Sequence, residues 1–481
     1  MTFVISFVSH MALNFDPGKY PILGTVGKVA DHRKVAVYAV GGFVRDTLLG
    51  KVCKDIDFVV VGSGADFARA VSKELGASKV VVYEKFGTAL VEINEYKLEF
   101  VGARKESYRS DSRKPIVEPA DLQTDLARRD FTINALAISV NAATFGQLTD
   151  PFDGMTALKK RIIRTPLDPG VTFEDDPLRI MRAIRFATQL DFEIETETMA
   201  GMQEMSQRLQ IVSAERISED FLKILATRKP SKGLLLMDSC GVLKIIFPEL
   251  IKLKGVEQVA GHHHKDVFFH TLKVLDNVAA VTDKLKLRYV ALVHDIAKPR
   301  TKEFVAGKGW TFHNHEEVGA RMLPAIGYRL RLPKEMTKYA QKLTRLHLRP
   351  IALTEEGVTD SAYRRLLVQA SEVLDDLIML CRADITSQNA KRVQKHLRNF
   401  DFVVERLQEV EEKDRMRAFQ SPVRGDEIMK VCGLKPGPAV GRLKKMIEEA
   451  ILDGKIPNEY EAAYNYLIEI KDQVQRDRAS S

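Results

Sequence analysis

A chain of 481 residues is too long to fold around a single hydrophobic core, so we expect three or four domains. Its 45% hydrophobic and 29% charged residues are ordinary for a globular protein, and the net charge of +8 favours a polyanionic partner. The four cysteines lie far apart and form no CxxC pair, which argues against a disulfide framework or a zinc ribbon and fits a reducing compartment.

Residues 1–30 are predicted to be an N-terminal extension, with Met1 or Met11 as the first residue. A brief apolar run over residues 3–8 lacks a basic leader and is far shorter than a membrane span. No stretch of the chain approaches the length of apolar sequence that a membrane helix needs. We therefore expect a cytoplasmic protein that does not associate with a membrane.

The first pattern that suggests a functional site is a pair of carboxylates at the start of a predicted strand. Asp55 and Asp57 lead into the run 58–61, whose β-branched and aromatic residues predict a buried strand. Because the side chains of a strand alternate between its faces, both carboxylates are predicted to share one face, while Ile56 and Phe58 point into the core. Adjacent carboxylates disfavour each other's ionisation, and a divalent cation such as Mg²⁺ relieves that conflict.

A glycine pair precedes the carboxylates. Gly41 and Gly42 lie between the apolar run 35–40 and an amphipathic segment that carries Arg45 and Asp46. Backbone N–H groups at such a turn can approach an anion closely, and the following helix N-terminus favours negative charge. A tight turn beside a solvated acidic strand end would explain either feature alone. Their combination in one strand–turn–helix–strand unit favours phosphate and metal binding, which implies nucleotidyl transfer.

The string GGFVRDTLLGKVCKDIDFVVVG resembles the signature of the class II tRNA nucleotidyltransferases, the CCA-adding enzymes, and of the related bacterial poly(A) polymerases. The catalytic sheet of that superfamily is similar to that of polymerase β. The resemblance implies that Asp55 and Asp57 hold Mg²⁺ ions and carry the catalysis. It also implies that Gly41, Gly42, Arg45 and Asp46 bind the nucleotide, with Gly42 and Arg45 on the triphosphate of CTP or ATP.

The next segments complete the predicted head domain. We expect a helix over 66–76 that ends at Gly76. Three strands should follow, at 79–83, 87–94 and 96–102. Glu99 alternates with apolar neighbours, so it is either a third carboxylate of the site or an ordinary charge on an edge strand. The polar segment 103–125 is predicted to be a mobile loop, and the resemblance implies that it assists the switch from CTP to ATP.

A second chemical pattern lies in residues 126–140, LARRDFTINALAISV. Paired arginines can clamp a triphosphate, although a helix start with surface arginines would give the same pattern. RRDFTINA is similar to a family motif that contacts the phosphate and ribose of the nucleotide. The resemblance therefore assigns nucleotide binding to Arg128, Arg129, Asp130 and Asn134.

Residues 174–186, EDDPLRIMRAIRF, form the third pattern. Asp176, Arg179 and Arg182 recur three apart, which predicts that they share one helical face. An ion pair within a helix would explain this spacing, but a carboxylate beside an arginine can also read a Watson–Crick edge. The segment resembles the ED-x-x-R motif of class II enzymes, which implies that Asp176 and Arg179 act as a template for C and then A. Arg182 and Arg185 match positions that face phosphates or organise the helix.

Eight of the eleven histidines lie between residues 262 and 347. His294 and Asp295 are adjacent, and further candidate ligands lie on neighbouring predicted helices. Such a set indicates a metal site more strongly than a single histidine does. The order H…HD…H…H…D resembles the HD phosphohydrolase domain. That resemblance implies a divalent metal of unknown identity held by four residues, His270, His294, Asp295 and Asp384.

His315 and His347 match the extra ligands of two-metal variants of that domain. A bound metal would lower the pKa of its water, so the site could hydrolyse phosphate esters. The ligands could equally persist for structure alone.

The predicted fold is of the α+β class. We expect a polymerase β-like nucleotidyltransferase head, with a mixed sheet and helices, followed by an all-helical neck, HD body and tail. The predicted domains are the head at 31–165, a neck that carries the nucleotide template and RNA contacts at 166–235, an HD-type helical domain at 236–395 and a tRNA-binding tail at 396–481.

The predicted function is template-independent addition of CCA to the 3′ end of tRNA from CTP and ATP, with accessory HD phosphohydrolase activity. A poly(A) polymerase or a CC-adding enzyme would share the head motifs, so both stay open as alternatives. An alternative of another class is a metal-dependent HD phosphohydrolase whose head binds nucleotide or RNA. The sequence does not determine the oligomeric state.

Overall fold

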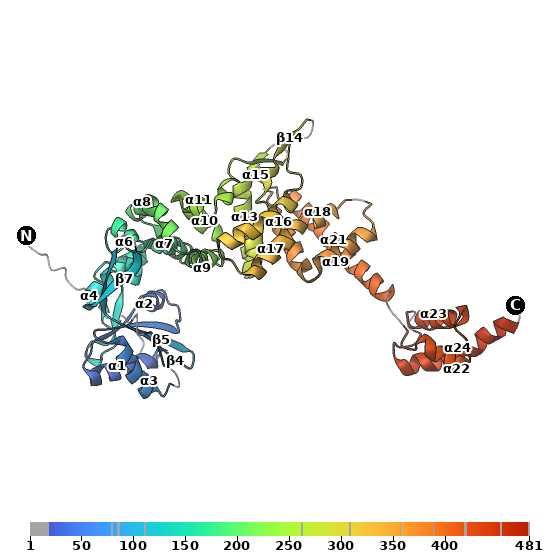
Figure 1. The fold of residues 1–481 in the computed structure, drawn as a ribbon, viewed down its shortest axis with the longest axis horizontal. Coiled ribbons are helices and arrows are strands. Elements are labelled where there is room, and N and C mark those ends of the chain that lie inside the picture. The colour runs from blue at the N-terminus through green and yellow to red at the C-terminus, as the bar shows by residue number, and fades with distance from the viewer. Residues whose placement is uncertain are drawn as a thin grey trace, which may run out of the picture. The chain divides into compact units, whose positions relative to one another are not determined.

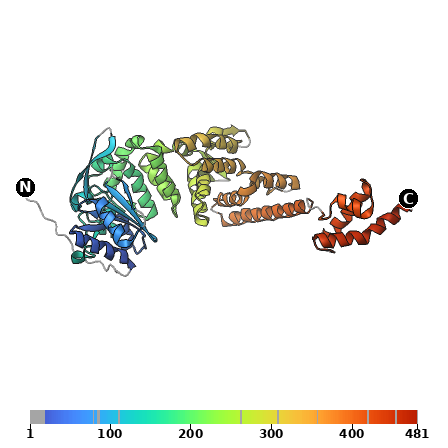
Figure 2. The same cartoon turned by 60° about the horizontal axis from the view of Figure 1, so that its bottom comes forward.

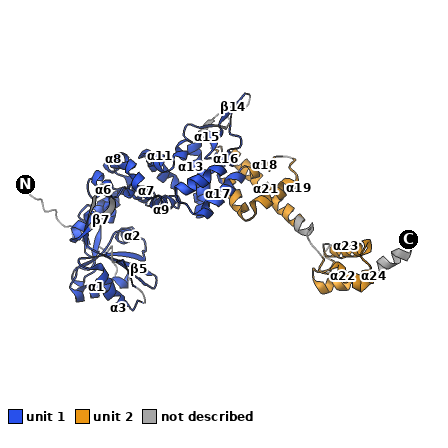
Figure 3. Cartoon of the chain, viewed as in Figure 1, with its two compact units in different colours: residues 1–347, 383–386 blue, residues 348–382, 387–481 orange. Residues whose placement is uncertain are grey.

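The computed structural model describes residues 19–77, 80–83, 87–109, 112–260, 263–306, 309–355, 357–387, 389–417, 421–452 and 455–479. The chain forms two compact units, one of residues 1–347 with 383–386 and one of residues 348–382 with 387–481 (Figure 3). Most of the predicted extension 1–30, with the choice between Met1 and Met11, lies outside the described residues. Among the helices that are described, none is long and apolar enough to cross a membrane.

The head is built on a seven-stranded mixed sheet with the order β3-β4-β5-β2-β1-β8-β9 (Figure 1). β2 and β5 run parallel, and the other neighbouring strands are antiparallel. The strands are β1 (Val37–Val40), β2 (Asp55–Val60), β3 (Val80–Tyr83), β4 (Thr88–Ile93), β5 (Tyr96–Gly102), β8 (Ala137–Ser139) and β9 (Leu148–Thr149). The head helices are α1 (Pro21–Arg33), α2 (Gly42–Leu48), α3 (Gly64–Leu75), α4 (Leu122–Ala127) and α5 (Gly154–Lys160), with short 3₁₀ turns η3 (Thr132–Asn134) and η4 (Ala142–Thr144).

One face of this sheet is covered and the other is left for the site. Ile56 and Phe58 of β2 are fully buried, whereas Asp55 and Asp57 lie on the opposite, exposed side, so the predicted alternation is confirmed. Phe58 stacks on Phe100 of β5 with ring centroids 4.8 Å apart. Helix α3 packs on β4 and β5, and α1 packs on α3, as the two views of the fold show (Figures 1 and 2). The carboxylates are thereby left facing away from the core.

The prediction that residues 103–125 form a loop is wrong. The described residues of this segment form an antiparallel pair of strands, β6 (Arg104–Arg109) and β7 (Ser112–Pro119), followed by helix α4. The two prolines in β7 misled the prediction, since proline cannot donate to a ladder. A two-stranded ribbon tolerates them because half of its N–H groups face away from the partner strand in any case. Cross-strand pairing of Lys105 with Glu118 adds opposite charges at one register position.

The rest of the first unit is mostly helical. Its helices are α6 (Pro169–Asp175), α7 (Leu178–Gln189), α8 (Thr196–Met205), α9 (Ala214–Leu225), α10 (Pro230–Ser239), α11 (Val242–Ile246), α12 (Pro248–Ile251), α13 (Val267–Val281), α14 (Leu285–Val293), α15 (Lys298–Thr301), α16 (His315–Arg329) and α17 (Lys334–Leu346), with a 3₁₀ turn η5 (Ser206–Ile211). Three small two-stranded sheets interrupt them, namely β10 (Ile162–Ile163) with β11 (Glu193–Ile194), β12 (Glu257–Ala260) with β13 (His263–Asp266), and β14 (Glu303–Val305) with β15 (Gly309–Thr311).

A buried arginine connects the neck to the helices that follow. Arg288 of α14 is only 2% exposed. Its Nη1 donates hydrogen bonds to the carbonyl oxygens of Leu225, at 3.1 Å, and Thr227, at 2.8 Å. These carbonyls lie at the C-terminal end of α9, where a helix leaves acceptors without partners and favours a cation. Arg288 therefore fixes the end of the neck helix against α14.

The second unit consists of helices. They are α18 (Arg349–Ala352), α19 (Asp360–Ala370), α20 (Leu374–Ala383), whose last residue belongs to the first unit, α21 (Ala390–Arg417), α22 (Gly425–Cys432), α23 (Pro438–Leu452) and α24 (Tyr460–Ala479), with a 3₁₀ turn η6 (Ser371–Val373). Helices α22, α23 and α24 share a core that includes Leu443, Ile447 and Leu467. The boundary between units at 347/348 falls inside the predicted segment 236–395, and the predicted domain limits stay predictions.

Candidate active site and metal centre

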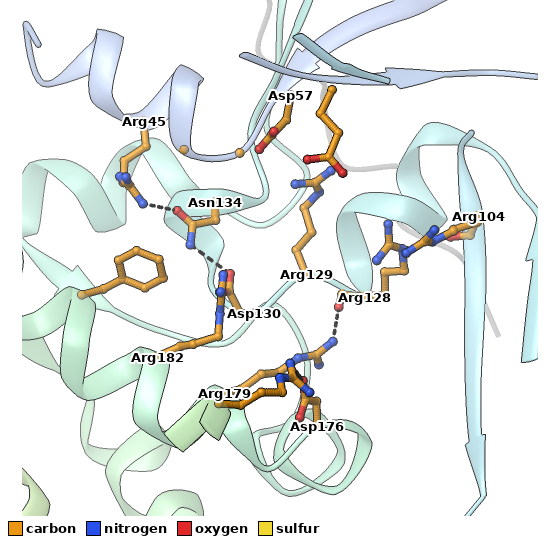
Figure 4. A pocket seen from close by; sticks show the side chains of 15 residues that line it. Arg45, Asp57, Arg104, Arg128, Arg129, Asp130, Asn134, Asp176, Arg179 and Arg182 are labelled. Atoms are coloured by element: carbon orange, nitrogen blue, oxygen red, sulfur yellow. Dashed lines mark hydrogen bonds and ion pairs between the residues drawn. The ribbon is translucent and has the colours of Figure 1, made fainter. Parts of the chain in front are cut away.

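A cavity of about 760 Å³ lies between the exposed face of the head sheet and the first neck helices (Figure 4). Most of the predicted head and neck residues line it: Gly41, Gly42, Arg45, Asp57, Arg128, Arg129, Asp130, Asn134, Asp176, Arg179 and Arg182. Of the predicted set, Asp46, Asp55 and Arg185 do not line it. Figure 4 shows Asp57 under the strands, with Asp176, Arg179 and Arg182 on the opposite side of the cavity.

Four further residues line the cavity, and only one of them was considered from the sequence. Glu99 is that residue, and the others are Arg104, Phe186 and Arg216. The β2–β5 register places Glu99 directly opposite Asp57, so its alternation along a strand was the available signal. Nothing in the sequence marks Arg104, Phe186 or Arg216 as residues of the site. They reach the cavity only because the β6–β7 hairpin, α7 and α9 pack around it.

Asp57 and Glu99 form a carboxylate pair across two parallel strands. Partial burial raises the pKa of the Asp57 carboxyl, and Asp55 adds to that effect while Arg129 opposes it. Burial and the neighbouring Asp57 likewise raise the pKa of Glu99. Asp55 thus disfavours ionisation of Asp57, and Asp57 disfavours that of Glu99. Hard oxygen donors in this arrangement fit a divalent cation such as Mg²⁺.

The glycine turn brings the backbone against these groups. Gly41 has a φ of +70°, in the region that favours glycine. A Cβ at this position would lie 3.1 Å from Arg129 Nη1 and 3.8 Å from Asp57 Oδ2. A side chain here would therefore crowd the arginine as well as strain the backbone. The turn, the strand carboxylate of the first motif and Arg129 of the second motif therefore lie close together.

A continuous hydrogen-bond network joins the head to α7. Arg45 donates from Nε and Nη2 to the carboxylate of Asp46, at 3.0 and 2.8 Å, and from Nη1 to Asn134 Oδ1 at 2.7 Å. Asn134 Nδ2 donates to Asp130 Oδ1 at 2.9 Å, and Arg182 Nε donates to Asp130 Oδ2 at 2.7 Å. Asp46 does not line the cavity, but its carboxylate holds the guanidinium of Arg45, which does. The network holds groups from both sides of the cavity in fixed positions (Figure 4).

The prediction that Asp176 shares a helical face with Arg179 and Arg182 is wrong. Helix α6 ends at Asp175 and α7 begins at Leu178, so Asp176 lies between the two helices in an extended conformation. The three-residue spacing suggested a single helix, but Pro177 follows Asp176 and disfavours a helical conformation in the residue before it. Asp176 Oδ2 instead accepts a hydrogen bond from Arg216 Nη2 at 3.3 Å. Arg179 is held by the carbonyl oxygens of Thr172 and Arg128.

Arg185 turns away from the cavity and forms a buried ion pair with Asp220 of α9. Phe186 takes its place beside the cavity. Three guanidinium carbons lie 4.6–5.4 Å from its ring centroid, those of Arg45, Arg182 and Arg185. A cation over an aromatic ring is attracted to the negative π-face, so Phe186 favours the guanidinium groups gathered around it.

A second cluster lies in the helices from α13 onward and contains the predicted metal ligands. The ligand atoms form two groups, and within each group all of them lie within 4.8 Å of one another. One group is His270, His294 and Asp384, and the other is Asp295, His315 and His347. Asp295 joins the groups, since its Oδ2 lies 3.4 Å from His294 Nε2 and its Oδ1 lies 3.2 Å from His315 Nε2. The predicted ligands, including the two assigned to a second metal, are therefore together.

Hydrogen bonds behind the rings orient three of these histidines. Nδ1 of His294, His315 and His347 lies 2.9, 2.8 and 2.6 Å from a backbone carbonyl oxygen. A carbonyl accepts only from a protonated nitrogen, so a neutral ring keeps its lone pair on Nε2, which faces the cluster. His315 Nε2 and His347 Nε2 lie 3.2 Å apart, and the buried His294 Nε2 makes no hydrogen bond with a described residue. Lone pairs facing each other repel unless a cation lies between them.

The carboxylates of the cluster attract positive charge, which either a proton on His294 or a metal ion in its place can supply. Burial opposes protonation of His294, but Asp295 and Asp384 raise its pKa to about 10. Lys298 Nζ also lies 2.7 Å from Asp295 Oδ2. The cluster therefore demands positive charge, and its imidazole and carboxylate donors fit a divalent transition metal.

Known proteins resemble this chain along most of its length. Residues 37–164 match the family described as Poly A polymerase head domain, residues 191–253 the Probable RNA and SrmB- binding site of polymerase A, and residues 267–389 the HD domain. An A-adding tRNA nucleotidyltransferase of Deinococcus radiodurans is 30% identical over 433 residues, 88% of this chain and 93% of the relative. A Multifunctional CCA protein of Pseudomonas fluorescens is 34% identical over 320 residues, 65% of this chain and 74% of the relative.

Solved structures agree with these relatives. A tRNA nucleotidyltransferase complexed with a primer tRNA and an incoming ATP analog superposes with a TM-score of 0.57 at 26% identity, covering 80% of this chain and 99% of the other. A CCA-adding enzyme in apo form II superposes with a TM-score of 0.59 at 25% identity, covering 94% of this chain and 96% of the other.

Proposed function

The chain belongs to the tRNA nucleotidyltransferase family, as the sequence resemblance predicts, and from this premise we propose that it adds CCA to the 3′ end of tRNA, using CTP and then ATP. One observation carries the proposal. Asp57 and Glu99, the glycine turn and Arg129 stand on one side of a cavity whose other side carries Asp176 and Arg179. A nucleoside triphosphate in such a cavity would have its phosphates beside the carboxylates and its base beside the neck.

Each side of the cavity has its own task. Asp55, Asp57 and Glu99 would hold Mg²⁺, which when bound lowers the pKa of the attacking tRNA hydroxyl and stabilises charge on the phosphoryl oxygens. Arg129 and the backbone at Gly42 bind the triphosphate. Arg45 uses three of its five N–H groups on Asp46 and Asn134, which leaves two for a phosphate oxygen.

The opposite side selects the base. Arg179 is nearly buried, at 8% exposed, and two backbone carbonyls hold its guanidinium, so its free N–H groups present a fixed donor pattern. Asp176 supplies acceptors beside it, and Arg216 limits where that carboxylate can point. A base that offers the complementary edge is accepted without a nucleic-acid template.

A basic cavity of about 870 Å³ supports tRNA as the partner. Five cations line it, Arg161, Lys223, Arg228, Lys229 and Lys232, and part of its lining falls in the segment that matches the RNA-binding family. Lys223, Arg228 and Lys229 make no ion pair with any residue that the structure describes. We propose that these cations bind phosphates of the tRNA, so that recognition rests on the shape and charge of the duplex rather than on its sequence.

The metal centre has a separate role in the proposal. Its six ligands would hold one or two divalent metals, which when bound lower the pKa of a bound water for attack on a phosphate ester. Lys298 adds a buried positive charge beside the ligand Asp295, with its Nζ 2.7 Å from Asp295 Oδ2. The identity of the metal and the oligomeric state are not part of the proposal.

Incubation with tRNA transcripts tests the main proposal. A tRNA that lacks CCA should gain three nucleotides with CTP and ATP together, two with CTP alone and none with ATP alone. Asp57→Asn should abolish incorporation and leave metal-dependent phosphatase activity intact, whereas His294→Ala should do the reverse. Incorporation that survives in Asp57→Asn would contradict the site, and a long A tail would indicate a poly(A) polymerase.

A-addition alone is a second candidate, because the A-adding relative from Deinococcus radiodurans aligns with 88% of this chain. An A-adding enzyme would extend only a transcript that already ends in CC, and only with ATP. A CC-adding enzyme would stop after two cytidines even with ATP present. A second transcript that ends in CC, assayed beside the one that lacks CCA, therefore separates all three specificities.

A further inference from the structure

A fully buried carboxylate contacts two of the arginines that line the nucleotide cavity. Asp125 of α4 is 0% exposed and does not itself line the cavity. Its Oδ1 accepts hydrogen bonds from Arg128 Nη2 at 2.6 Å and Nε at 3.1 Å, and its Oδ2 accepts one from Arg129 Nη2 at 3.1 Å. A buried carboxylate is costly unless it is paired and hydrogen-bonded, so the two guanidinium groups and Asp125 fix one another in place.

Arg128 uses this pairing to hold the β6–β7 hairpin. Its Nε also donates to the carbonyl oxygen of Arg104 at 3.2 Å, and Asp125 Oδ1 accepts from the backbone N–H of Arg104 at 3.4 Å. Arg104 is the first residue of β6. Figure 4 shows the side chains of Arg128 and Arg104 beside each other. Arg128 and Asp125 together therefore attach the start of the hairpin to the end of α4.

Arg129 points towards the catalytic carboxylates instead. A Cβ at Gly41 would lie 3.1 Å from its Nη1 and 3.8 Å from Asp57 Oδ2, and Figure 4 shows its side chain reaching towards Asp57. Asp125 contacts only its Nη2, and its buried Nε makes no hydrogen bond with a described residue. A buried N–H donor normally has an acceptor, and a phosphate oxygen of a nucleotide in the cavity would be a strong one.

We propose that Asp125 is a positioning residue for nucleotide binding, which acts on the triphosphate through Arg129. Because the carboxylate holds Nη2, the Nε and Nη1 groups of Arg129 keep one orientation towards the phosphates before the nucleotide arrives. Less side-chain freedom is then lost on binding, and the affinity is higher. This role rests on the nucleotidyl transfer proposed for the cavity, and it adds a residue that does not touch the nucleotide.

Titration calorimetry with CTP and with inorganic tripolyphosphate, in Mg²⁺ and without tRNA, measures this effect. Asp125→Asn keeps the shape of the side chain but replaces one acceptor with a donor, so Arg129 loses its fixed orientation. We expect the Kd of both probes to rise roughly tenfold, the loss that one hydrogen bond to a charged group causes. Unchanged Kd values, or a rise for CTP alone, would overturn the proposal, because the effect must reach the phosphates.

A matched control lies on the same helix. Asp121 is exposed, and its Oδ1 caps α4 by accepting from the backbone N–H of Thr124 at 2.8 Å. Asp121→Asn makes the same chemical change four residues away, and asparagine is as good a cap as aspartate. Both Kd values should therefore stay at the wild-type level. An equal rise in Asp121→Asn and Asp125→Asn would show that any disturbance of α4 weakens binding, which overturns the specific role of Asp125.

Double variants separate positioning from a general loss of structure. If Asp125 acts through Arg129, Asp125→Asn should cause no further rise in Kd in an Arg129→Met background, because the side chain that it orients is gone. In an Arg128→Met background the rise should persist. Equal rises in both backgrounds would overturn the proposal.

A further variant leaves Asp125 in place and tests the same idea if Asp125→Asn does not fold. Lysine keeps the positive charge but lacks the planar fork that can contact Asp125 and a phosphate at once. Arg129→Lys should therefore bind both probes as weakly as Arg129→Met. Wild-type affinity in Arg129→Lys would show that charge alone is sufficient, and the proposal would then be wrong.

Incorporation assays keep the positioning role distinct from CCA addition. If the wild type adds CCA but Asp125→Asn binds both probes normally, the positioning role fails and the proposed function stands. If Asp125→Asn weakens both probes but the wild type extends no tRNA transcript, CCA addition fails and the positioning role stands. The preference for CTP over UTP should be unchanged in Asp125→Asn, because Arg179 is held by the carbonyl oxygen of Arg128 rather than by its guanidinium. A changed preference would mean that the whole cavity has shifted, which overturns a role through Arg129.

Discussion

Asp130 is the junction between the head and α7, and Asp130→Asn tests whether its charge holds the network together. Its Oδ2 accepts from Arg182 Nε at 2.7 Å and its Oδ1 from Asn134 Nδ2 at 2.9 Å. Burial by itself would raise the pKa of this carboxyl, but Arg182 and Asn134 lower it from 3.8 to about 2. Because one pKa unit corresponds to about 1.4 kcal/mol, the ionised carboxylate contributes about 2 kcal/mol of stability. A depressed pKa in the folded state means that this contribution is complete above pH 3.8 and is lost as the pH falls through 2.

The amide of Asp130→Asn replaces one acceptor with a donor, which must face either Arg182 or Asn134. At pH 7 we expect a loss of about 2 kcal/mol in unfolding free energy, seen by scanning calorimetry as a decrease of about 4–8 °C in the melting temperature of the head. Nucleotide incorporation should fall with it, because the network positions both sides of the cavity. Asp153→Asn, at an exposed carboxylate, is the matched control and should change neither.

The pH dependence distinguishes the causes. The difference between wild type and Asp130→Asn should shrink as the pH is lowered from 3.8 towards 2, because the wild-type carboxylate loses its advantage in this range. A difference that is the same at pH 7 and at pH 3 would show that the amide itself causes the loss. The argument from the ion pair with Arg182 would then be wrong.

Two further predictions concern the metal centre and the neck. Removal of divalent metal with a chelator should lower the melting temperature of the wild type but not that of His294→Ala. The reason is that a metal at a hundred times its Kd stabilises the folded state by about 2.7 kcal/mol. Equal shifts of the two melting temperatures in differential scanning fluorimetry would refute a structural metal at this cluster. Arg288→Met should cost about 3 kcal/mol in unfolding free energy, since buried carbonyls at the end of α9 lose their donor. Lys286→Met on the exposed side of the same helix should cost almost nothing, and denaturant titration of both variants checks the difference.

The alternation of β2 and the end of α3 were predicted because both are local. A strand with one buried face repeats every two residues, so Ile56 and Phe58 were enough to place Asp55 and Asp57 together. Helix α3 ends at Gly76, with φ +63°, because a residue without a side chain adopts the left-handed conformation at little cost. The resemblance to the HD domain also gave the set of predicted metal ligands, because the order of histidines and aspartates that carries it can be read from the sequence alone.

Long-range pairing decided the remaining features. Glu99 became a partner of Asp57 only through the parallel register of β2 with β5, two strands separated by a helix and a hairpin. Asp176 left the face of α7 because proline ended one helix and another began, and Arg216 then reached it from α9. Local preferences act over a few residues, whereas the choice of partner and register depends on which surfaces the whole chain can bury together. Sequence therefore named most of the groups in the cavity, and tertiary packing determined which of them face one another.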